Sequence, residues 1–85
     1  MFYYIYVLKS AIDENLYVGL TNDLRRRMAE HNDGKVRSTA ARRPLELVYY
    51  EACRSQADAI KREKYLKTAW GKRYIKNRLI DYLTG

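Results

Sequence analysis

The sequence predicts an α+β domain whose small three-stranded, mainly antiparallel sheet is flanked by helices, in the order β-β-α-β-α-α. Three aromatic and β-branched segments predict the strands, and segments with helical apolar spacing follow the second and third of them. A length of 85 residues supports one domain, which we place at residues 1–85. A hydrophobic content of 47% argues against disorder, because enough apolar surface exists to form a packed core.

The N-terminal segment predicts a β-hairpin. Residues 2–8 and 16–20 are rich in aromatic and β-branched residues, and turn-forming residues lie between them. If the register pairs the tyrosine-bearing faces, Tyr6 and Tyr17 approach each other beside Gly19. A strand glycine often marks a close approach by another group. The structural alternative is that these tyrosines only pack against the sheet.

The first helix is predicted to begin after an Asn22 cap and to end near His31. Leu24 and Met28 are spaced for its buried side, and Arg27 and His31 project together from an adjacent face. His31 suits a functional site, but a histidine near a helix C-terminus also stabilises the helix dipole as a cation. We expect the basic, polar residues 34–43 that follow to form an exposed loop.

The C-terminal half predicts one more strand and two helices. Residues 45–50 form the strand, and Ser55 begins a helix that runs to about Ala69. Gly71 is expected to break it, and a last helix follows over residues 72–83. Trp70 would then cover the junction between the two helices, and Cys53 would be a small buried hydrophobe.

Glu63 is the residue that a purely structural role explains least well. It shares the i, i+4, i+7 stripe of Ala59 and Leu66, and is the only acid between Lys61 and Arg78. A carboxylate on the apolar side of a helix is costly unless a cation or a metal ion pairs with it. The sequence leaves both partners open: a basic neighbour or a metal.

The charge of +7 is concentrated in two segments. Residues 25–43 carry seven basic and two acidic side chains, and residues 61–78 carry eight basic side chains and one acid. Two basic segments separated by near-neutral strands favour a nucleic-acid partner over a uniformly solvated surface. The residues expected to bind it are Arg25, Arg26, Lys35, Arg37, Arg42, Arg43, Lys61, Lys64, Lys67, Lys72 and Arg73.

Other classes of protein are excluded by composition. The single cysteine rules out an intramolecular disulfide and a cysteine-rich zinc site. No apolar run approaches the ~20 residues of a membrane span, and no signal sequence precedes the first strand. We therefore expect a cytoplasmic protein with no membrane partner.

The singled-out residues resemble the GIY-YIG nuclease superfamily. The resemblance rests on Tyr4-Ile5-Tyr6, Tyr17-Val18-Gly19, Arg27, His31 and Glu63, in this order and spacing, and covers nearly the whole chain. It is strongest to the small stand-alone bacterial members, which resemble the N-terminal nuclease domain of the excinuclease C subunit. Tyr4 stands in the place of the glycine of the first motif, a departure that concerns backbone shape more than chemistry.

The resemblance implies hydrolysis of phosphodiester bonds with one Mg²⁺ or Mn²⁺ ion held by Glu63. It implies catalytic roles for Tyr6, Tyr17, Arg27 and His31, with one motif tyrosine activating water. We favour Tyr6 for that role, with His31 taking its proton and Tyr17 positioning the phosphate or water. The roles of the two tyrosines remain exchangeable.

The late asparagine of the family corresponds to Asn77. The stripe of Ile75, Leu79 and Leu83 points this residue away from the core, which would suit a phosphate contact.

The resulting hypothesis is a metal-dependent DNA endonuclease acting in DNA repair or on branched or damaged DNA. DNA is favoured over RNA, and selectivity would come from nucleic-acid shape or from a partner protein, since the chain shows no groove-reading element. The alternatives are a nucleic-acid-binding module without activity and, more weakly, a protein-interaction domain.

Overall fold

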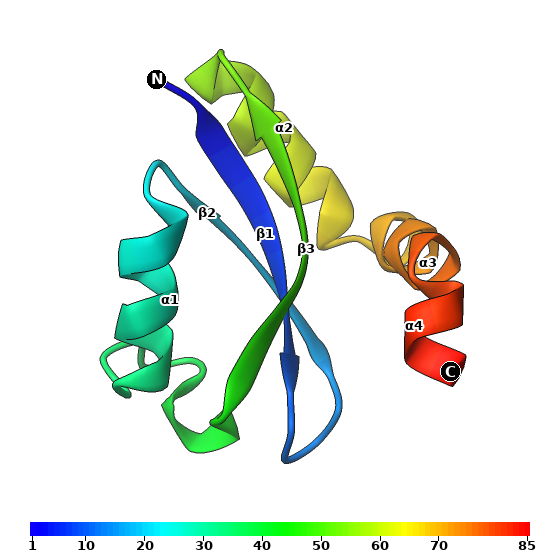
Figure 1. The fold of residues 1–85 in the computed structure, drawn as a ribbon. Coiled ribbons are helices and arrows are strands. Elements are labelled where there is room, and N and C mark those ends of the chain that lie inside the picture. Colours follow the sequence, from blue (N-terminus) through cyan, green and yellow to red (C-terminus); the bar gives the residue numbers. More distant parts are fainter.

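The computed structural model describes all residues from 1 to 85 and confirms the α+β fold. Strand β1 (Tyr3–Ser10) lies at the centre of a three-stranded antiparallel sheet, between β2 (Leu16–Thr21) and β3 (Leu45–Cys53) (Figure 1). β3 extends three residues beyond the predicted strand, because its end pairs with the start of β1.

The register between β1 and β2 pairs the tyrosine-bearing faces. Tyr6 lies opposite Gly19, and Leu8 lies opposite Tyr17. Tyr4, in the place of the motif glycine, pairs regularly with Thr21, so the departure leaves the strand backbone undisturbed. The pairing of β1 with β2 therefore places the Tyr6 ring over Gly19, which has no side chain.

Helices cover both faces of the sheet and divide the core into two clusters (Figure 1). Helix α1 (Leu24–Asn32) covers the face that bears Tyr6 and Leu8, where Leu24 and Met28 pack as predicted. Helices α2 (Gln56–Leu66) and α3 (Ala69–Arg78) cover the opposite face. The buried residues of that second cluster are Ile5, Val7, Ala59, Leu66 and Ile75.

The start of α1 and the segment after it differ from the prediction. The cap is Asp23 and not Asn22, because the Asp23 carboxylate accepts the backbone N–H of Arg26 at 3.1 Å. The segment expected to be an exposed loop contains a short 3-10 helix, Ala40–Arg42, and a buried threonine, Thr39. This segment therefore contributes to the interior beside α1.

The predicted helix break at Gly71 is wrong. Helix α2 ends at Leu66, and Thr68 caps α3, so Gly71 lies buried inside the first turn of α3. A Cβ there would collide with the backbone of Tyr65 and Leu66. Glycine is required by the close approach of two helices and not by a break.

The single C-terminal helix predicted over residues 72–83 is also not observed. Residues 72–83 are divided between α3 and a separate short helix, α4 (Ile80–Thr84). Trp70 is 68% exposed, so it does not cover the helix junction. Cys53 is half-buried against the second core cluster. None of the helices is both long and apolar enough to cross a bilayer.

Candidate active site

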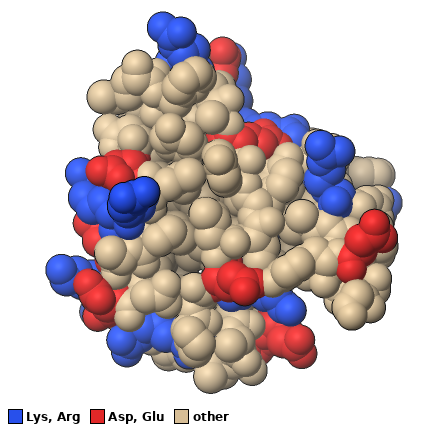
Figure 2. Space-filling view, in the orientation of Figure 1, with Lys and Arg blue, Asp and Glu red and all other residues tan.

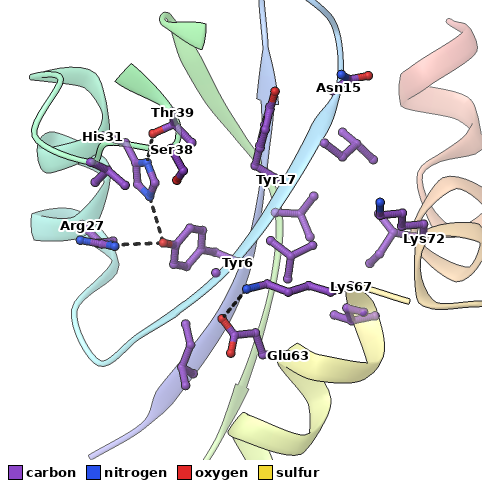
Figure 3. A pocket seen from close by; sticks show the side chains of 18 of the residues that line it. Tyr6, Asn15, Tyr17, Arg27, His31, Ser38, Thr39, Glu63, Lys67 and Lys72 are labelled. Carbon is purple, nitrogen blue, oxygen red and sulfur yellow. Dashed lines mark hydrogen bonds and ion pairs between the residues drawn. The ribbon is translucent and has the colours of Figure 1, made fainter. Parts of the chain in front are cut away.

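An open pocket of about 820 Å³ lies along the edge strand β2 and reaches both helical layers (Figure 3). Residues from β1, β2, α1, α2 and α3 line it. The five residues singled out by the motif resemblance all lie on its wall: Tyr6, Tyr17, Arg27, His31 and Glu63. The fold therefore brings together side chains that are up to 57 residues apart in the sequence.

The Tyr6 side chain is the buried centre of one wall. It is 3% exposed, and its ring occupies the space above Gly19 that a Cβ would fill. The phenolic oxygen lies 2.9 Å from Nε2 of His31 and accepts a hydrogen bond from Nε of Arg27 at 3.2 Å (Figure 3). Tyr6 thus joins the sheet to two consecutive turns of α1.

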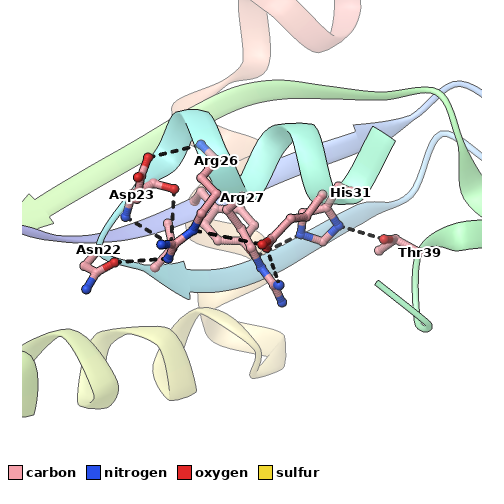
Figure 4. A network of polar contacts seen from close by, with 9 residues as sticks. Asn22, Asp23, Arg26, Arg27, His31 and Thr39 are labelled. Carbon is pink, nitrogen blue, oxygen red and sulfur yellow. Dashed lines mark hydrogen bonds and ion pairs between the residues drawn. The ribbon is translucent and has the colours of Figure 1, made fainter. Parts of the chain in front are cut away.

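His31 is buried between two hydroxyl groups. Its Nδ1 lies 2.7 Å from Oγ1 of Thr39, on the side opposite Tyr6 (Figures 3 and 4). Burial, followed by the nearby charge of Arg27, lowers the pKa of His31 below its ordinary value. The neutral imidazole is therefore favoured near pH 7. Its burial and lowered pKa disfavour the alternative in which His31 acts as a cation that stabilises the helix dipole.

Arg27 carries a fixed positive charge to the pocket wall. Its hydrogen bond to Tyr6, and then its contact with Glu30 at 3.0 Å, raise the pKa of the guanidinium further. Figure 4 shows the polar network at the start of α1, where Asn22, Asp23 and Arg26 hold the first turn. Arg25 and Arg26 lie on the exposed side of this helix and do not line the pocket.

Tyr17 lines the same pocket, but its hydroxyl is engaged elsewhere. It donates a 2.7 Å hydrogen bond to Asp13 in the hairpin loop, so it points away from Tyr6 and His31 (Figure 3). This hydrogen bond raises the pKa of Tyr17 and lowers that of Asp13. A tyrosine that is hydrogen-bonded to a carboxylate keeps its own proton and does not readily form the phenolate that would accept a proton from water. This favours Tyr6 over Tyr17 as the residue that activates water.

Glu63 reaches the pocket from α2, on the other side of β2 from His31 (Figure 3). Its side chain is 20% exposed and forms an ion pair with Lys67, whose Nζ lies 3.3 Å from Oε2. The carboxylate is accordingly at the pocket surface and not in the apolar core. The basic neighbour that the sequence left open as its partner is present.

The side chains around Glu63 fit a metal ion that prefers oxygen ligands and needs few of them from the protein. No group of three or more His, Cys, Asp or Glu residues is placed to bind a metal ion. Zinc-type sites need such a group, whereas Mg²⁺ is held by one or two carboxylates together with water and substrate phosphates. Glu63 shares the pocket lining with one other carboxylate, Glu14, so Mg²⁺ or Mn²⁺ held by Glu63 would need water and a substrate phosphate as further ligands.

The basic residues expected to bind nucleic acid are divided by the structure. Lys67 and Lys72 line the pocket, together with Lys76, which the sequence analysis did not single out. Arg42 is paired with Asp13, and Arg43 donates to the carbonyl of Ala40. The predicted residues that lie outside the pocket wall are Arg25, Arg26, Lys35, Arg37, Arg42, Arg43, Lys61, Lys64, Arg73 and Asn77. Figure 2 shows Lys and Arg mostly at the periphery of the visible face, interspersed with acids.

Two further pocket residues, which the sequence does not predict, carry hydroxyl groups. Ser38 and Thr39 reach the wall from the segment predicted to be an exposed loop. Only the fold of this segment brings Thr39 against His31, eight residues earlier. Neither periodicity nor residue type in the sequence signals that contact. Asn77, expected to point away from the core, is exposed on α3.

Comparisons with known proteins agree with this geometry. A family model described as the GIY-YIG catalytic domain matches residues 2–78. A UPF0213 protein of Bacillus pumilus is 48% identical over 67 residues, which cover 78% of this chain and 67% of that protein. A UPF0213 protein of Natronomonas pharaonis is 42% identical over 84 residues, or 98% and 95% of the two chains.

A solved structure is also similar. The solution NMR structure of a UPF0213 protein from Bacillus halodurans superposes with a TM-score of 0.57 and 31% sequence identity, and the match covers 91% of this chain and 84% of that one. The family model and this solved structure therefore both match nearly the whole chain.

Proposed function

The chain belongs to the GIY-YIG family, and from that premise we propose that it is a metal-dependent endonuclease that hydrolyses phosphodiester bonds in DNA. The observation that carries the proposal is the hydrogen-bonded pair of Tyr6 and His31 in a pocket whose far wall presents Glu63. A protein that only binds nucleic acid needs basic side chains, but has no use for a buried proton acceptor opposite a carboxylate.

Tyr6 and His31 supply the proton transfer. Neutral His31 takes the phenolic proton at Nε2, and the phenolate of Tyr6 then accepts a proton from the attacking water. The Nε–H of Arg27 donates to the same oxygen and stabilises its negative charge. The imidazolium formed at His31 neutralises the adjacent phenolate, so charge does not accumulate in the buried wall.

Arg27 would also stabilise the charge that develops on the phosphate. Its guanidinium lines the pocket, and no protonation change is needed for it to stabilise the pentacoordinate phosphorus and the leaving oxygen. Lys72 and Lys76 add positive charge on the α3 side. Glu63 would hold one Mg²⁺ or Mn²⁺ ion, which supplies Lewis-acid neutralisation of phosphate charge when bound.

The substrate proposed is DNA rather than RNA, and branched or damaged DNA in repair is the favoured context. The pocket is open and lies along a sheet edge, and no element projects from it to read a groove. Selectivity would then rest on nucleic-acid shape or on a partner protein. The ten predicted residues outside the pocket, Asn77 among them, would guide the strand toward it through phosphate contacts.

Strand cleavage tests the proposal. Supercoiled plasmid incubated with the wild type should be nicked in Mg²⁺ or Mn²⁺ and left intact in EDTA. Glu63→Ala should lose the metal-dependent nicking, whereas Glu46→Ala, which removes an exposed carboxylate outside the pocket, should retain it. Absence of cleavage on single-stranded, duplex and branched DNA would contradict the proposed nuclease activity. Full activity of Glu63→Ala would contradict only the proposal that Glu63 holds the metal ion.

The second candidate is a binding module that lacks useful activity. Six basic residues and no acid occupy positions 64–80, which favours phosphate binding with or without cleavage. Fluorescence of Trp70, the only tryptophan and an exposed one, offers a direct binding readout. Binding that weakens steeply with salt, in a protein that cleaves nothing, would support this candidate.

A further inference from the structure

Thr39 carries a buried hydroxyl that has no role in the proton transfer proposed above. The residue is 2% exposed, and the one side-chain hydrogen bond of its Oγ1 is the 2.7 Å contact with Nδ1 of His31. Tyr6 lies at the other nitrogen of the same ring. The three side chains form a continuous line from the 34–43 segment, through α1, to the central strand of the sheet.

The tautomer of His31 decides whether this line can move a proton. A neutral imidazole carries one N–H. When the proton is on Nδ1, Nε2 has a free lone pair that accepts the proton of Tyr6. When it is on Nε2, that nitrogen is blocked. The hydrogen bond made by one ring nitrogen sets the state of the other.

We propose that Thr39 is a positioning residue: its Oγ1 accepts the Nδ1–H of His31 and holds the imidazole in the tautomer whose Nε2 receives the proton of Tyr6. This inference rests on the proposed function and assigns a role to a residue outside the motif set.

The surroundings of the Tyr6 oxygen favour this tautomer. Arg27 is always a donor, so the phenolic oxygen already accepts one hydrogen bond. With the imidazole proton on Nδ1, the phenol accepts from Arg27 and donates to His31. With the proton on Nε2, two donors point at the phenolic oxygen, and its own proton has no acceptor in the protein. Each tautomer therefore leaves one hydroxyl hydrogen without a protein acceptor, that of Thr39 or that of Tyr6, but only the Nδ1–H tautomer avoids two donors at the phenolic oxygen.

The contact with Thr39 can also persist throughout the transfer. The O–H bond of Tyr6 breaks, and an N–H bond forms at Nε2 of His31, while the Nδ1–H to Thr39 contact is unchanged. The imidazolium has two N–H donors, and Thr39 and Tyr6 provide an acceptor for each. The charged groups facing His31 are Arg27 and Glu30, both from α1. No side chain therefore has to rearrange when the proton moves.

The segment that presents Thr39 is anchored at both ends. The Asn32 side chain exchanges two hydrogen bonds with the backbone of Leu45, at 2.9 and 3.1 Å, which ties the end of α1 to β3. The Ser10 hydroxyl donates to the carbonyl of Arg42 at 2.7 Å, which ties the segment to β1. These bonds fix the position of the Thr39 hydroxyl before substrate binds.

Nitrogen NMR of the imidazole tests the inference directly. His31 is the only histidine, so ¹⁵N-histidine labelling gives one ring spectrum without assignment. Above the pKa of His31, the wild type should show the Nδ1–H tautomer. Thr39→Val, which keeps the shape but removes the acceptor, should shift His31 toward the Nε2–H tautomer, and Thr39→Ser should restore it. Ser38→Ala controls for loss of a neighbouring hydroxyl and should leave the ring spectrum unchanged.

Two results would overturn the inference: an Nε2–H tautomer in the wild type, or an unchanged tautomer in folded Thr39→Val. In cleavage assays, Thr39→Val should lower kcat about tenfold with little change in KM, and Thr39→Ser should recover most of it. If the wild type cleaves nothing, the proposed function fails, but the ring spectrum still decides whether Thr39 sets the tautomer.

Discussion

The phenolic oxygen of Tyr6 lies 2.9 Å from Nε2 of His31, although 25 residues separate the two in the chain. β1 supplies one partner and the last full turn of α1 the other, and Arg27 donates to the same oxygen from the turn before. A tyrosine between a fixed cation and a neutral imidazole has both a proton acceptor and a charge stabiliser. Tyr6 makes this contact and Tyr17 does not, because the Tyr17 hydroxyl donates to Asp13.

Replacement of Tyr17 should cost little activity. Tyr17→Phe removes the hydrogen bond to Asp13 but touches neither His31 nor Arg27. The single-turnover cleavage rate should stay within about fivefold of wild type, since loss of a general acid or base costs about 10²–10⁴-fold. A drop of a hundredfold or more in a folded Tyr17→Phe protein would mean that Tyr17, and not Tyr6, handles the proton.

Cleavage should fall in acid as His31 becomes charged. Burial and Arg27 lower the pKa of His31, so the neutral form persists to a pH below its ordinary value of about 6.5. Below the folded-state pKa, cleavage should lose about tenfold per pH unit, and no further gain from His31 is expected above pH 6.5. A rate that rises as the pH falls from 7 to 5 would contradict a neutral acceptor.

The same shift predicts a loss of stability in acid. The unfolded chain binds a proton at histidine before the folded one does, so the free energy of unfolding decreases as the pH falls from about 6.5 through the folded-state pKa. Urea unfolding at pH 7.5 and 5.5 measures the decrease. His31→Gln should show a smaller decrease over this interval; an equal one would remove His31 as its source.

The absence of a side chain at Gly19 should be necessary for the Tyr6 position. In Gly19→Ala the new Cβ would collide with Oη and Cζ of Tyr6 and lie 2.8 Å from its Cε1. The ring must move, at a cost of about 1–3 kcal/mol in unfolding free energy, and the contact with His31 should be lost. Gly71→Ala is the control, because it crowds α2 instead and should leave the His31 ring spectrum unchanged. An unchanged spectrum in Gly19→Ala would contradict this role.

Glu51 should hold α2 against the sheet. Its carboxylate accepts two hydrogen bonds from Arg62, at 2.8 and 2.9 Å, and one from Tyr49 at 2.9 Å. The Arg62 hydrogen bond lowers the pKa of Glu51, so this stabilisation is present at neutral pH and is lost as the pH falls through that lowered pKa.

In urea unfolding at pH 7, Glu51→Ala should cost about 2 kcal/mol, because it removes charged hydrogen bonds that are partly shielded from water. Arg26→Ala is the comparison, since the Arg26 side chain is 62% exposed and lies 4.0 Å from Glu30, so its loss should cost less than about 0.5 kcal/mol. Equal costs for the two variants would show that the Glu51 network is not an anchor.

Much of the fold follows from local sequence patterns. Alternation in the two hairpin strands places Tyr6 and Gly19 on one face, which is the pairing observed. The Ser55 cap and the buried Ala59 and Leu66 of α2 also follow from spacing alone. The role of Gly71 does not follow from sequence, because glycine signals a helix break and a close helix contact equally, and only the packing against Leu66 distinguishes the two.

The site was predictable where motif residues lie on regular elements. The i, i+4 spacing of Arg27 and His31 on one helix face brings both to the Tyr6 oxygen. Thr39 was not predictable, because its position depends on tertiary hydrogen bonds from Ser10 and Asn32 that fold an irregular segment back onto α1. The hydrogen bond from Tyr17 to Asp13 depends likewise on the conformation of the hairpin loop.

The role of the Tyr6 hydroxyl is tested most directly by the single-turnover cleavage rate of Tyr6→Phe beside the wild type, in Mg²⁺ or Mn²⁺, with DNA affinity measured on the same samples. Tyr6→Phe keeps the ring over Gly19 and removes only the hydroxyl that faces His31 and Arg27. If Tyr6 activates the attacking water, the rate should fall by at least about a hundredfold, with affinity within about twofold of wild type. A Tyr6→Phe protein that cleaves DNA as fast as the wild type would contradict that role.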